Sequence, residues 1–348
     1  MVLVYAVVVA LIVDVFLTTW GFRGPNPRYG FEAMYTFKAH RPFAYRVLMP
    51  LIIRGVDAAT PFIVVKAEVL DQKNIYRRWG WEREIDKPQV IAYFLLLLFL
   101  FGAVWCARLC TKYSYPLAAP PLQDLMPAVA LLFLPLTFIQ GGYMYDFPEL
   151  FFLFASTAAL LRQNWLIYYL LYPLAVVNKE SGALIAVYFV ALNWREMARG
   201  RLLKHLTAQA LIAVPVIALI RLWAGGNPGQ AMEVHLQHNL DFLLDPRSYL
   251  AFFDIYVPLV PVPRGFNLLS VATVLFLIIF RWRVKPLPLR RLLIGSTAVV
   301  VPLYLVGSVE DEIRALSLAF VPLYLLGFDT VQSLYAGTWP PPAPDPRE

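Results

Sequence analysis

Long apolar segments dominate this chain and restrict what it can fold into. Segments such as 2–17, 90–104 and 294–306 each carry at most one charged residue. Hydrophobic residues make up 59% of the 348 positions and charged residues 15%, whereas about a quarter of a soluble domain is charged. This composition excludes a soluble globular enzyme, a disordered protein and a disulfide-stapled secreted domain. It predicts a polytopic α-helical membrane protein, and the unbroken apolar segments argue against a membrane β-barrel.

The hydropathy pattern predicts about ten membrane-spanning helices in an all-α fold. We place them near 1–20, 89–109, 127–140, 147–161, 165–177, 181–193, 208–224, 267–280, 292–307 and 316–328. Several are shorter than the roughly 20 residues that cross a bilayer, so we expect their polar ends to continue as helix. We therefore predict one transmembrane domain over 1–328, followed by a proline-rich, disordered tail at 329–348.

The distribution of basic residues predicts the orientation of the chain. Lysine and arginine gather in 195–204 and 281–291, whereas the short loops on the opposite side carry single basic residues. The positive-inside rule then places both termini in the cytoplasm, in a plasma (inner) membrane. The net charge of +7 is explained by loops that face anionic lipid, so the predicted partner is the bilayer and not a nucleic acid.

The first outer loop, 21–88, departs from this rule because it is rich in basic residues. The rule weakens for loops longer than about 60 residues. Within the loop, the modestly apolar segment 47–65 is interrupted by charges and a proline, which predicts a helix lying in the outer interface. If that segment spanned the membrane, the following loops would change sides. Segment 66–88 is charged and amphipathic, and 225–266 forms a second large outer loop.

Charged residues gather at the predicted outer ends of the helices. Each charge at membrane depth costs about 2.5–3.5 kcal/mol on insertion scales, so these positions need an explanation. The alternation of spans places four clusters on one side, which predicts a shared site at the membrane–water boundary. The clusters are Glu32 with Arg41 and Arg46; Asp146 with Glu149; Lys179 with Glu180; and Glu310, Asp311 and Glu312 with Arg314.

Each cluster also has a structural explanation, which the sequence leaves open. The two arginines of the first cluster can snorkel from an interfacial helix. Asp146 can be the N-cap of the next helix, and Glu149 can favour its dipole. Lys179 and Glu180 can neutralise each other, and the acidic turn of the fourth cluster can simply be solvated.

The residue types point to chemistry on a lipid phosphate. Carboxylates can accept a proton from a hydroxyl or hold a metal, and arginine and lysine suit phosphate oxygens. Cations at that position also stabilise a phosphate leaving group. The sequence contains no P-loop, GxSxG or HExxH pattern, so no cofactor is assigned and the identity of any divalent metal stays open.

Four segments resemble a known family. They are FEAMY around Glu32, the basic-aromatic stretch KAHRPFAYRVLMP, the run from Pro127 to Glu149 that contains Asp146, and LAVVNKESGALI around Lys179. Together they resemble the GT-C superfamily of polyprenyl-phosphate-sugar-dependent glycosyltransferases, in the branch with protein O-mannosyltransferases and aminoarabinose transferases. The resemblance covers roughly residues 1–195.

The resemblance implies a GT-C-like core with interfacial helices in the first outer loop. The implied reaction transfers a sugar from a polyprenyl-phosphate carrier to a hydroxyl on the outer face. Glu32 is then the general base, and Asp146 is a second acid that orients the acceptor or holds a metal. The implied substrate-binding residues are Arg41, Arg46, Glu149, Lys179, Glu180 and Arg314.

Two other functions fit the same sequence. A transporter or flippase of a lipid-linked glycan would also gather charges in a polar cavity, but with broken helices near the bilayer midplane. A non-catalytic membrane component of a polysaccharide assembly complex would use the acidic turns only as caps. One outward cavity lined by Glu32, Asp146 and Lys179 favours the transferase, whereas alternating access favours the transporter.

Overall fold

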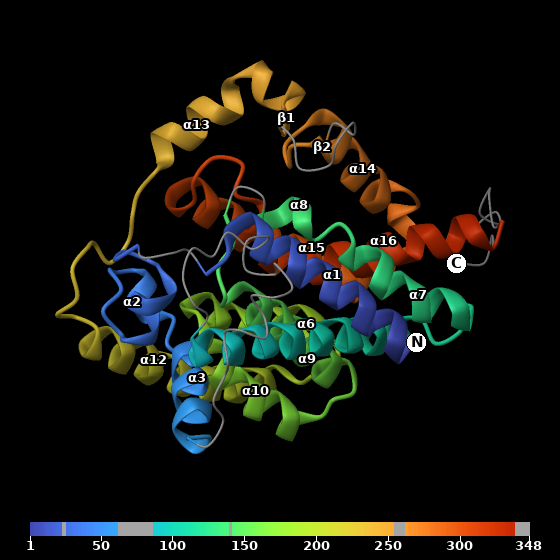
Figure 1. The fold of residues 1–348 in the computed structure, drawn as a ribbon. Helices are drawn as coiled ribbons and strands as arrows, with labels where there is room; N and C mark the ends of the chain where they lie inside the picture. Colours follow the sequence, from blue (N-terminus) through green and yellow to red (C-terminus); the bar gives the residue numbers. More distant parts are fainter. Residues whose placement is uncertain (23–25, 62–85, 139–140, 254–261, 338–348) are drawn as a thin grey trace.

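The fold is a bundle of helices of unequal length (Figure 1). The computed structural model describes residues 1–22, 26–61, 86–138, 141–253 and 262–337. The α-helices are α1 (Val2–Trp20), α2 (Phe31–Tyr35), α3 (Leu48–Ala59), α6 (Lys87–Ser114), α7 (Pro120–Leu131), α8 (Pro135–Phe138), α9 (Asp146–Leu161), α10 (Trp165–Asn178), α11 (Ile185–Asn193), α12 (Arg199–Trp223), α13 (Leu236–Leu244), α14 (Leu268–Ile279), α15 (Leu287–Gly307) and α16 (Phe320–Tyr335). Short 3₁₀ helices are η1 (Phe43–Tyr45), η2 (Glu180–Leu184), η3 (Pro246–Leu250), η4 (Trp282–Val284) and η5 (Ile313–Ala319), and β1 (Phe252–Phe253) pairs antiparallel with β2 (Val262–Pro263).

All ten predicted apolar segments contain helix, and in the described residues six helices are long and apolar enough to cross a membrane. These six are Val2–Trp20, Lys87–Ser114, Pro120–Phe138, Arg199–Trp223, Leu287–Gly307 and Ile313–Tyr335. The chain is therefore an all-α membrane protein. The remaining segments form shorter helices, of 16 residues in α9, 14 in α10 and 12 in α14, so ten crossings stay a prediction.

Helix α9 lies at the centre of the bundle and packs most extensively against α6. Nearly all of its residues are buried, including the small residues Ala155, Ser156, Ala158 and Ala159. Small side chains let helix backbones approach closely, which explains how α9 can be enclosed on all sides. In contrast, α14 has no buried residue and contacts the bundle through α16. The core thus fixes α9, whose first turn carries Asp146 and Glu149.

Helix α3 falls within the segment predicted to lie in the interface. Its twelve residues span about 18 Å, well short of the roughly 30 Å hydrocarbon core. Leu48, Met49 and Ile53 are buried on one face, and the charged residues Arg54 and Asp57 are not. This geometry agrees with a helix that does not cross the membrane. Most of the predicted amphipathic stretch 66–88 lies outside the described residues.

The segment from α13 to α14 stands away from the central helices along one edge of the molecule (Figure 1). Its anchor is Asn239, whose buried side-chain amide donates to the carbonyls of Tyr304, Leu305 and Ser308 at distances of 2.7–3.2 Å. These carbonyls belong to the C-terminal end of α15. The anchor therefore positions the preceding segment, 231–235, over the ends of the bundle helices.

The start of α1 and the end of α16 lie at the same end of the bundle (Figure 1). The connections that follow α10, α12 and α15 lie toward the other end, with the start of α9. Helix α16 continues to Tyr335, so it extends beyond the predicted domain limit at 328. Residues 338–348 of the predicted tail lie outside the described residues.

Candidate functional site

A cavity of about 590 Å³ lies at the end of the bundle opposite the termini. It collects side chains from six separate parts of the chain, between residue 28 and residue 318. Besides four tyrosines, its titratable lining residues are Arg28, Arg46, Glu149, Lys179, Glu180, Arg221, Glu233, His235, Glu312 and Arg314. The alternation of helices therefore does bring distant charges together at one end of the molecule.

Asp146 forms the first of two inner pairs. Its carboxylate oxygens accept hydrogen bonds from Arg314 Nη1 at 3.1 and 3.2 Å, and Oδ2 also accepts the backbone N–H of Tyr143 at 2.8 Å. Arg314 also donates through Nη2 to Glu312, and its guanidinium carbon lies 4.4 Å from the centre of the Tyr143 ring. The expected N-cap role of Asp146 is wrong: Tyr145 occupies the cap position and Asp146 is the first helical residue, so its side chain turns back to the preceding loop.

Glu149 and Lys179 form the second inner pair. Lys179 Nζ lies 2.7 Å from Glu149 Oε2, and the hydroxyls of Ser181 and Ser317 donate to Glu149 Oε1 at 2.9 and 3.0 Å. Glu149 is buried, and both of its oxygens are satisfied. Lys179 has three ammonium donors, and Glu149 takes one of them. The alternative in which Lys179 and Glu180 neutralise each other is wrong, because each of the two side chains pairs elsewhere.

Glu180, Arg46 and Arg221 form an outer group on the same cavity. Arg46 Nη1 lies 3.5 Å and Arg221 Nη2 3.9 Å from the Glu180 carboxylate. Good charge-assisted hydrogen bonds are about 2.7–2.9 Å long, so these are looser attractions. Burial opposes the charge on Arg46, but the nearby carboxylates of Glu180 and Glu149 outweigh it and raise the Arg46 pKa. The centre of the Tyr145 ring lies 5.5 Å from the guanidinium carbon of Arg46 and 5.8 Å from Nζ of Lys179. Tyr145 therefore contacts a cation of the outer group and a cation of an inner pair.

Residues from the two large predicted outer loops, 21–88 and 225–266, meet at the rim of the cavity. Glu233 pairs with Arg28 and lies 3.5 Å from the His235 ring nitrogen Nε2. Gly229 forms a bridge with Arg41 and has a φ of +93°, and a Cβ there would lie 2.6 Å from the Arg41 carbonyl oxygen. Only glycine accepts this conformation and this close approach without strain. The contact fixes segment 224–235 against the first outer loop.

Two predicted site residues lie away from the cavity. Glu32 is exposed in the first turn of α2, and it is not among the residues that line the cavity. Arg41 contributes its backbone to the rim, but its side chain does not line the cavity either. Asp146 lies behind its partner Arg314. The structure therefore brings together Arg46, Glu149, Lys179, Glu180 and Arg314, and places Glu32 and Arg41 outside this group.

Several residues of the site do not stand out in the sequence. Arg221 could have been found, because it is the cation at the outer end of the predicted span 208–224. Ser181 and Ser317 carry no such signal, since hydroxyls are frequent in membrane helices. Their role becomes visible only when Glu149 is seen to accept from both of them.

The carboxylates of the site pair with cations and do not converge on a point. Among the described residues, no three histidine, cysteine, aspartate or glutamate side chains gather as ligands for one metal ion. The arrangement is suited to bind an anion through cations and to accept a proton at a carboxylate.

Comparison with known proteins does not add a family. No family model matches the sequence, and searches of curated proteins and of solved structures find no similar protein. The functional interpretation therefore depends on geometry and residue chemistry.

Proposed function

We propose that this chain is a membrane glycosyltransferase that moves a sugar from a polyprenyl-phosphate carrier to an acceptor hydroxyl. In this proposal the core is GT-C-like, the membrane is the plasma (inner) membrane, both termini are cytoplasmic and the cavity opens on the outer face. The observation that carries the proposal is the outer group, in which two cations and one carboxylate share a cavity without tight mutual hydrogen bonds.

The carrier phosphate has a suitable set of donors. Arg46 and Arg221 face the cavity from the first outer loop and from the end of α12, and Lys179 adds an ammonium group with remaining donors. Arginine presents a planar fork of N–H groups that matches phosphate oxygens. When the bond between the sugar carbon and the phosphate oxygen breaks, its electron pair remains on the phosphate. The same cations stabilise that charge.

Glu180 is the carboxylate best placed to accept the proton of the acceptor hydroxyl. Glu149 is saturated by Lys179, Ser181 and Ser317, whereas Glu180 is held only by loose attractions. A phosphate that binds Arg46 and Arg221 draws these cations away from Glu180, so the carboxylate is freed for proton transfer. This assignment replaces Glu32 as the favoured base, because Glu32 does not line the cavity.

The test compares two glutamates that could each be the base. Wild type, Glu180→Gln and Glu32→Gln are reconstituted in lipid vesicles with a labelled polyprenyl-phosphate sugar and a hydroxyl-bearing acceptor, and release of polyprenyl phosphate is followed together with the labelled acceptor. A general base is worth about 10²–10⁴-fold in rate, so Glu180→Gln is expected to lose activity by that factor. If only Glu32→Gln loses activity, then Glu32 and not Glu180 is the general base.

Controls separate chemistry from folding. Glu196→Gln removes an exposed carboxylate beyond the end of α11, at the end of the bundle opposite the cavity, and should leave activity unchanged. Detergent stability of each variant is measured in parallel. If the wild type moves the labelled lipid across the vesicle membrane without breaking the sugar–phosphate bond, the transporter replaces the transferase.

A further inference from the structure

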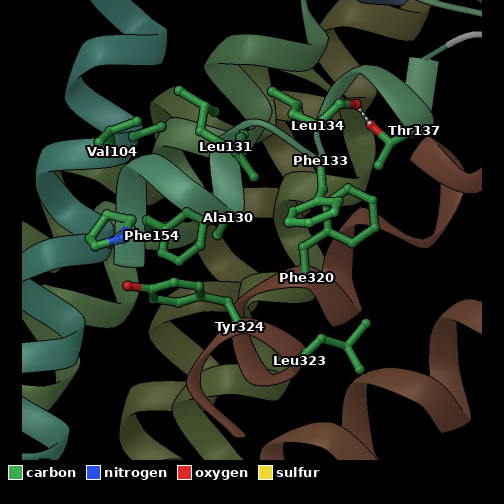
Figure 2. Close-up of a pocket in the computed structure, with 14 residues that line it drawn as sticks. Val104, Ala130, Leu131, Phe133, Leu134, Thr137, Phe154, Phe320, Leu323 and Tyr324 are labelled. Carbon is green, nitrogen blue, oxygen red and sulfur yellow. Dashed lines mark hydrogen bonds between the residues drawn. The ribbon is translucent and has the colours of Figure 1, made fainter. Parts of the chain in front are cut away.

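A second cavity, of about 190 Å³, lies beside the candidate site where a predicted membrane helix is broken. Residues 132–134 separate α7 from α8. The cavity is lined from α6, α7, α9 and α16, and Figure 2 draws Val104 and Phe154 along one side and Phe133 and Phe320 along the other. The break in the helix therefore leaves a space that side chains do not fill.

The cavity offers no attraction to water among its described lining residues. Thr137 is turned to the backbone, where its hydroxyl donates to the Leu134 carbonyl at 2.7 Å (Figure 2). The Tyr324 hydroxyl lies 2.7 Å from the Thr111 hydroxyl. The remaining side chains that line the cavity are apolar. A buried water needs two to four polar partners, and an engineered apolar cavity of about 150 Å³ stays dry and binds benzene.

The side chains around the cavity are apolar, and several of them are exposed. The break interrupts Pro120–Phe138, one of the candidate membrane spans. Phe133 lines the cavity and is 63% exposed, and its neighbour Leu132 is 52% exposed. Val129, one turn earlier, also has an exposed side chain. An empty cavity leaves the atoms that line it without contacts on one side. A hydrocarbon chain that enters the cavity makes these contacts and gains dispersion energy.

We propose that the cavity is a binding site for one acyl chain of a bilayer phospholipid, which enters past the exposed side chain of Phe133. The break lies only a few residues before the end of α8, near the end of the bundle that carries the polar cavity. A phospholipid of that leaflet can keep its headgroup at the surface while its chain passes the break. This site is separate from the transfer chemistry and does not depend on it.

The bound chain packs behind the charged site. Leu134, Thr137, Leu150 and Phe320 line the acyl-chain cavity and also a narrow pocket that contains Asp146, Glu149 and Arg314. The same four side chains thus contact both regions. A chain in the cavity supports this wall from one side, and the inner pairs lie on the other.

The experiment uses a photoreactive chain. The full protein is placed in nanodiscs of phosphatidylglycerol and phosphatidylethanolamine with a trace of phosphatidylcholine that carries a diazirine near the end of one acyl chain. After irradiation, labelled residues are mapped by mass spectrometry. In the wild type, label is expected on interior residues Phe154 and Tyr324, in addition to the lipid-exposed residues Phe94 and Leu98 of α6.

Two filling variants test whether the label depends on the cavity. Ala130→Phe places a ring in the cavity and is expected to reduce interior labelling at least several-fold, while labelling of Phe94 stays unchanged. Ala130→Leu fills less space and is used if the larger variant fails to fold. Leu98→Phe is the matched control, since it adds a ring on the exposed face of α6.

Three results would overturn the proposal. They are a wild type without interior label, an interior label that survives both filling variants, and an interior label obtained only with a diazirine-bearing polyprenyl phosphate under the same conditions. The last result would assign the cavity to the carrier chain instead of a bilayer lipid.

Discussion

The inner pairs and the outer group share one cavity but hold their charges in different ways. In the inner pairs, Asp146 accepts two hydrogen bonds from Arg314 at 3.1 and 3.2 Å and Glu149 accepts one from Lys179 at 2.7 Å, and neighbouring hydroxyls or backbone groups donate further hydrogen bonds to the same carboxylates. In the outer group, Glu180 lies 3.5 Å and 3.9 Å from its cations. Tight pairing indicates charges that hold the structure together, and loose pairing indicates charges that a ligand can recruit.

Burial explains the difference at Arg221. A charge removed from water is tolerated only when it is paired and hydrogen-bonded, so the enclosed carboxylates need complete sets of partners. Arg221 is more than half exposed and keeps water as an alternative partner, whereas Arg46 is as buried as Arg314 and also donates to the Pro42 carbonyl. The cost of releasing Arg221 from Glu180 is therefore small, and it falls further when a phosphate takes the place of Glu180.

The largest effect is expected from breaking an inner pair. Arg314→Met leaves Asp146 and Glu312 without their cation, and removal of one partner from a buried pair costs about 3–5 kcal/mol. Thermal denaturation in detergent should show this loss. Adding Asp146→Asn removes one of the two stranded charges, so the double variant should recover part of the stability. A single variant as stable as wild type would contradict the structural role of the inner pairs.

A smaller effect is expected in the outer group, and on binding instead of stability. Arg221→Gln removes one charge-assisted hydrogen bond to phosphate, worth about 1.5–3 kcal/mol, which corresponds to roughly a 10- to 100-fold weaker Kd. Binding of polyprenyl phosphate in nanodiscs measures this change. Arg199→Gln, at the opposite end of α12, is the control. Equal loss of thermal stability in Arg221→Gln and Arg314→Met would erase the distinction between the two regions.

A substitution at Gly229 on the rim tests whether the contact between segment 224–235 and the first outer loop is local. Gly229→Ala forces a Cβ against the Arg41 carbonyl at a positive φ, and such strain costs about 1–3 kcal/mol. The cost should appear locally, because segment 224–235 can separate from the first outer loop without unfolding the bundle. Hydrogen exchange of the 224–235 amides should accelerate while that of α9 stays unchanged. Faster exchange in α9 as well would show that the rim stabilises the whole fold.

The smallest effect is expected at an ion pair outside both regions. Lys87 and Tyr35 both donate to the Asp57 carboxylate and lower its pKa, and Lys87 has the larger effect. A lowered folded-state pKa means that the pair stabilises the protein above the unfolded pKa of about 3.9, and that this stability is lost as the pH falls through the lower folded value. The pair is partly exposed and close to the surface, so the gain is about 1 kcal/mol or less.

The measurement is the stability difference between wild type and Asp57→Asn as a function of pH. The difference should be constant near neutral pH and shrink below about pH 4, where the wild-type carboxylate takes up its proton. A difference that grows on acidification would mean that the Asp57 pKa is raised instead of lowered.

The sequence predicts which end of the bundle carries the charges, but not how they pair. Helix alternation alone places Asp146, Lys179 and Arg314 at one end. From the sequence, the adjacent residues Lys179 and Glu180 can neutralise each other, but Lys179 has an extended backbone with φ −162° and ψ 141° between α10 and η2. Successive side chains point in opposite directions along an extended segment. Lys179 therefore reaches Glu149, while Glu180 reaches the arginines.

The position of Glu32 shows a second limit of sequence-based reasoning. The sequence places it in the first outer loop with other charges, but the direction of its side chain depends on how α2 packs. Phe31 and Met34 are buried, so they fix the inward face of this short helix. Glu32 follows Phe31 by about 100° of helical rotation and points outward. A motif within a long loop identifies residue types, whereas tertiary packing decides which of them reach the cavity.

A narrow pocket between the polar cavity and the apolar cavity gives the site an electrical asymmetry. Arg314, one of the cations of the site, lines both the polar cavity and this narrow pocket, and the apolar cavity lies behind the pocket. Hydrocarbon polarises far less than water, so charge there is poorly screened on the apolar side. Low-dielectric walls focus field lines into a cleft lined by charge. An anion approaching the cavity mouth thus experiences a stronger and more directed potential than the same cations would produce on an open surface.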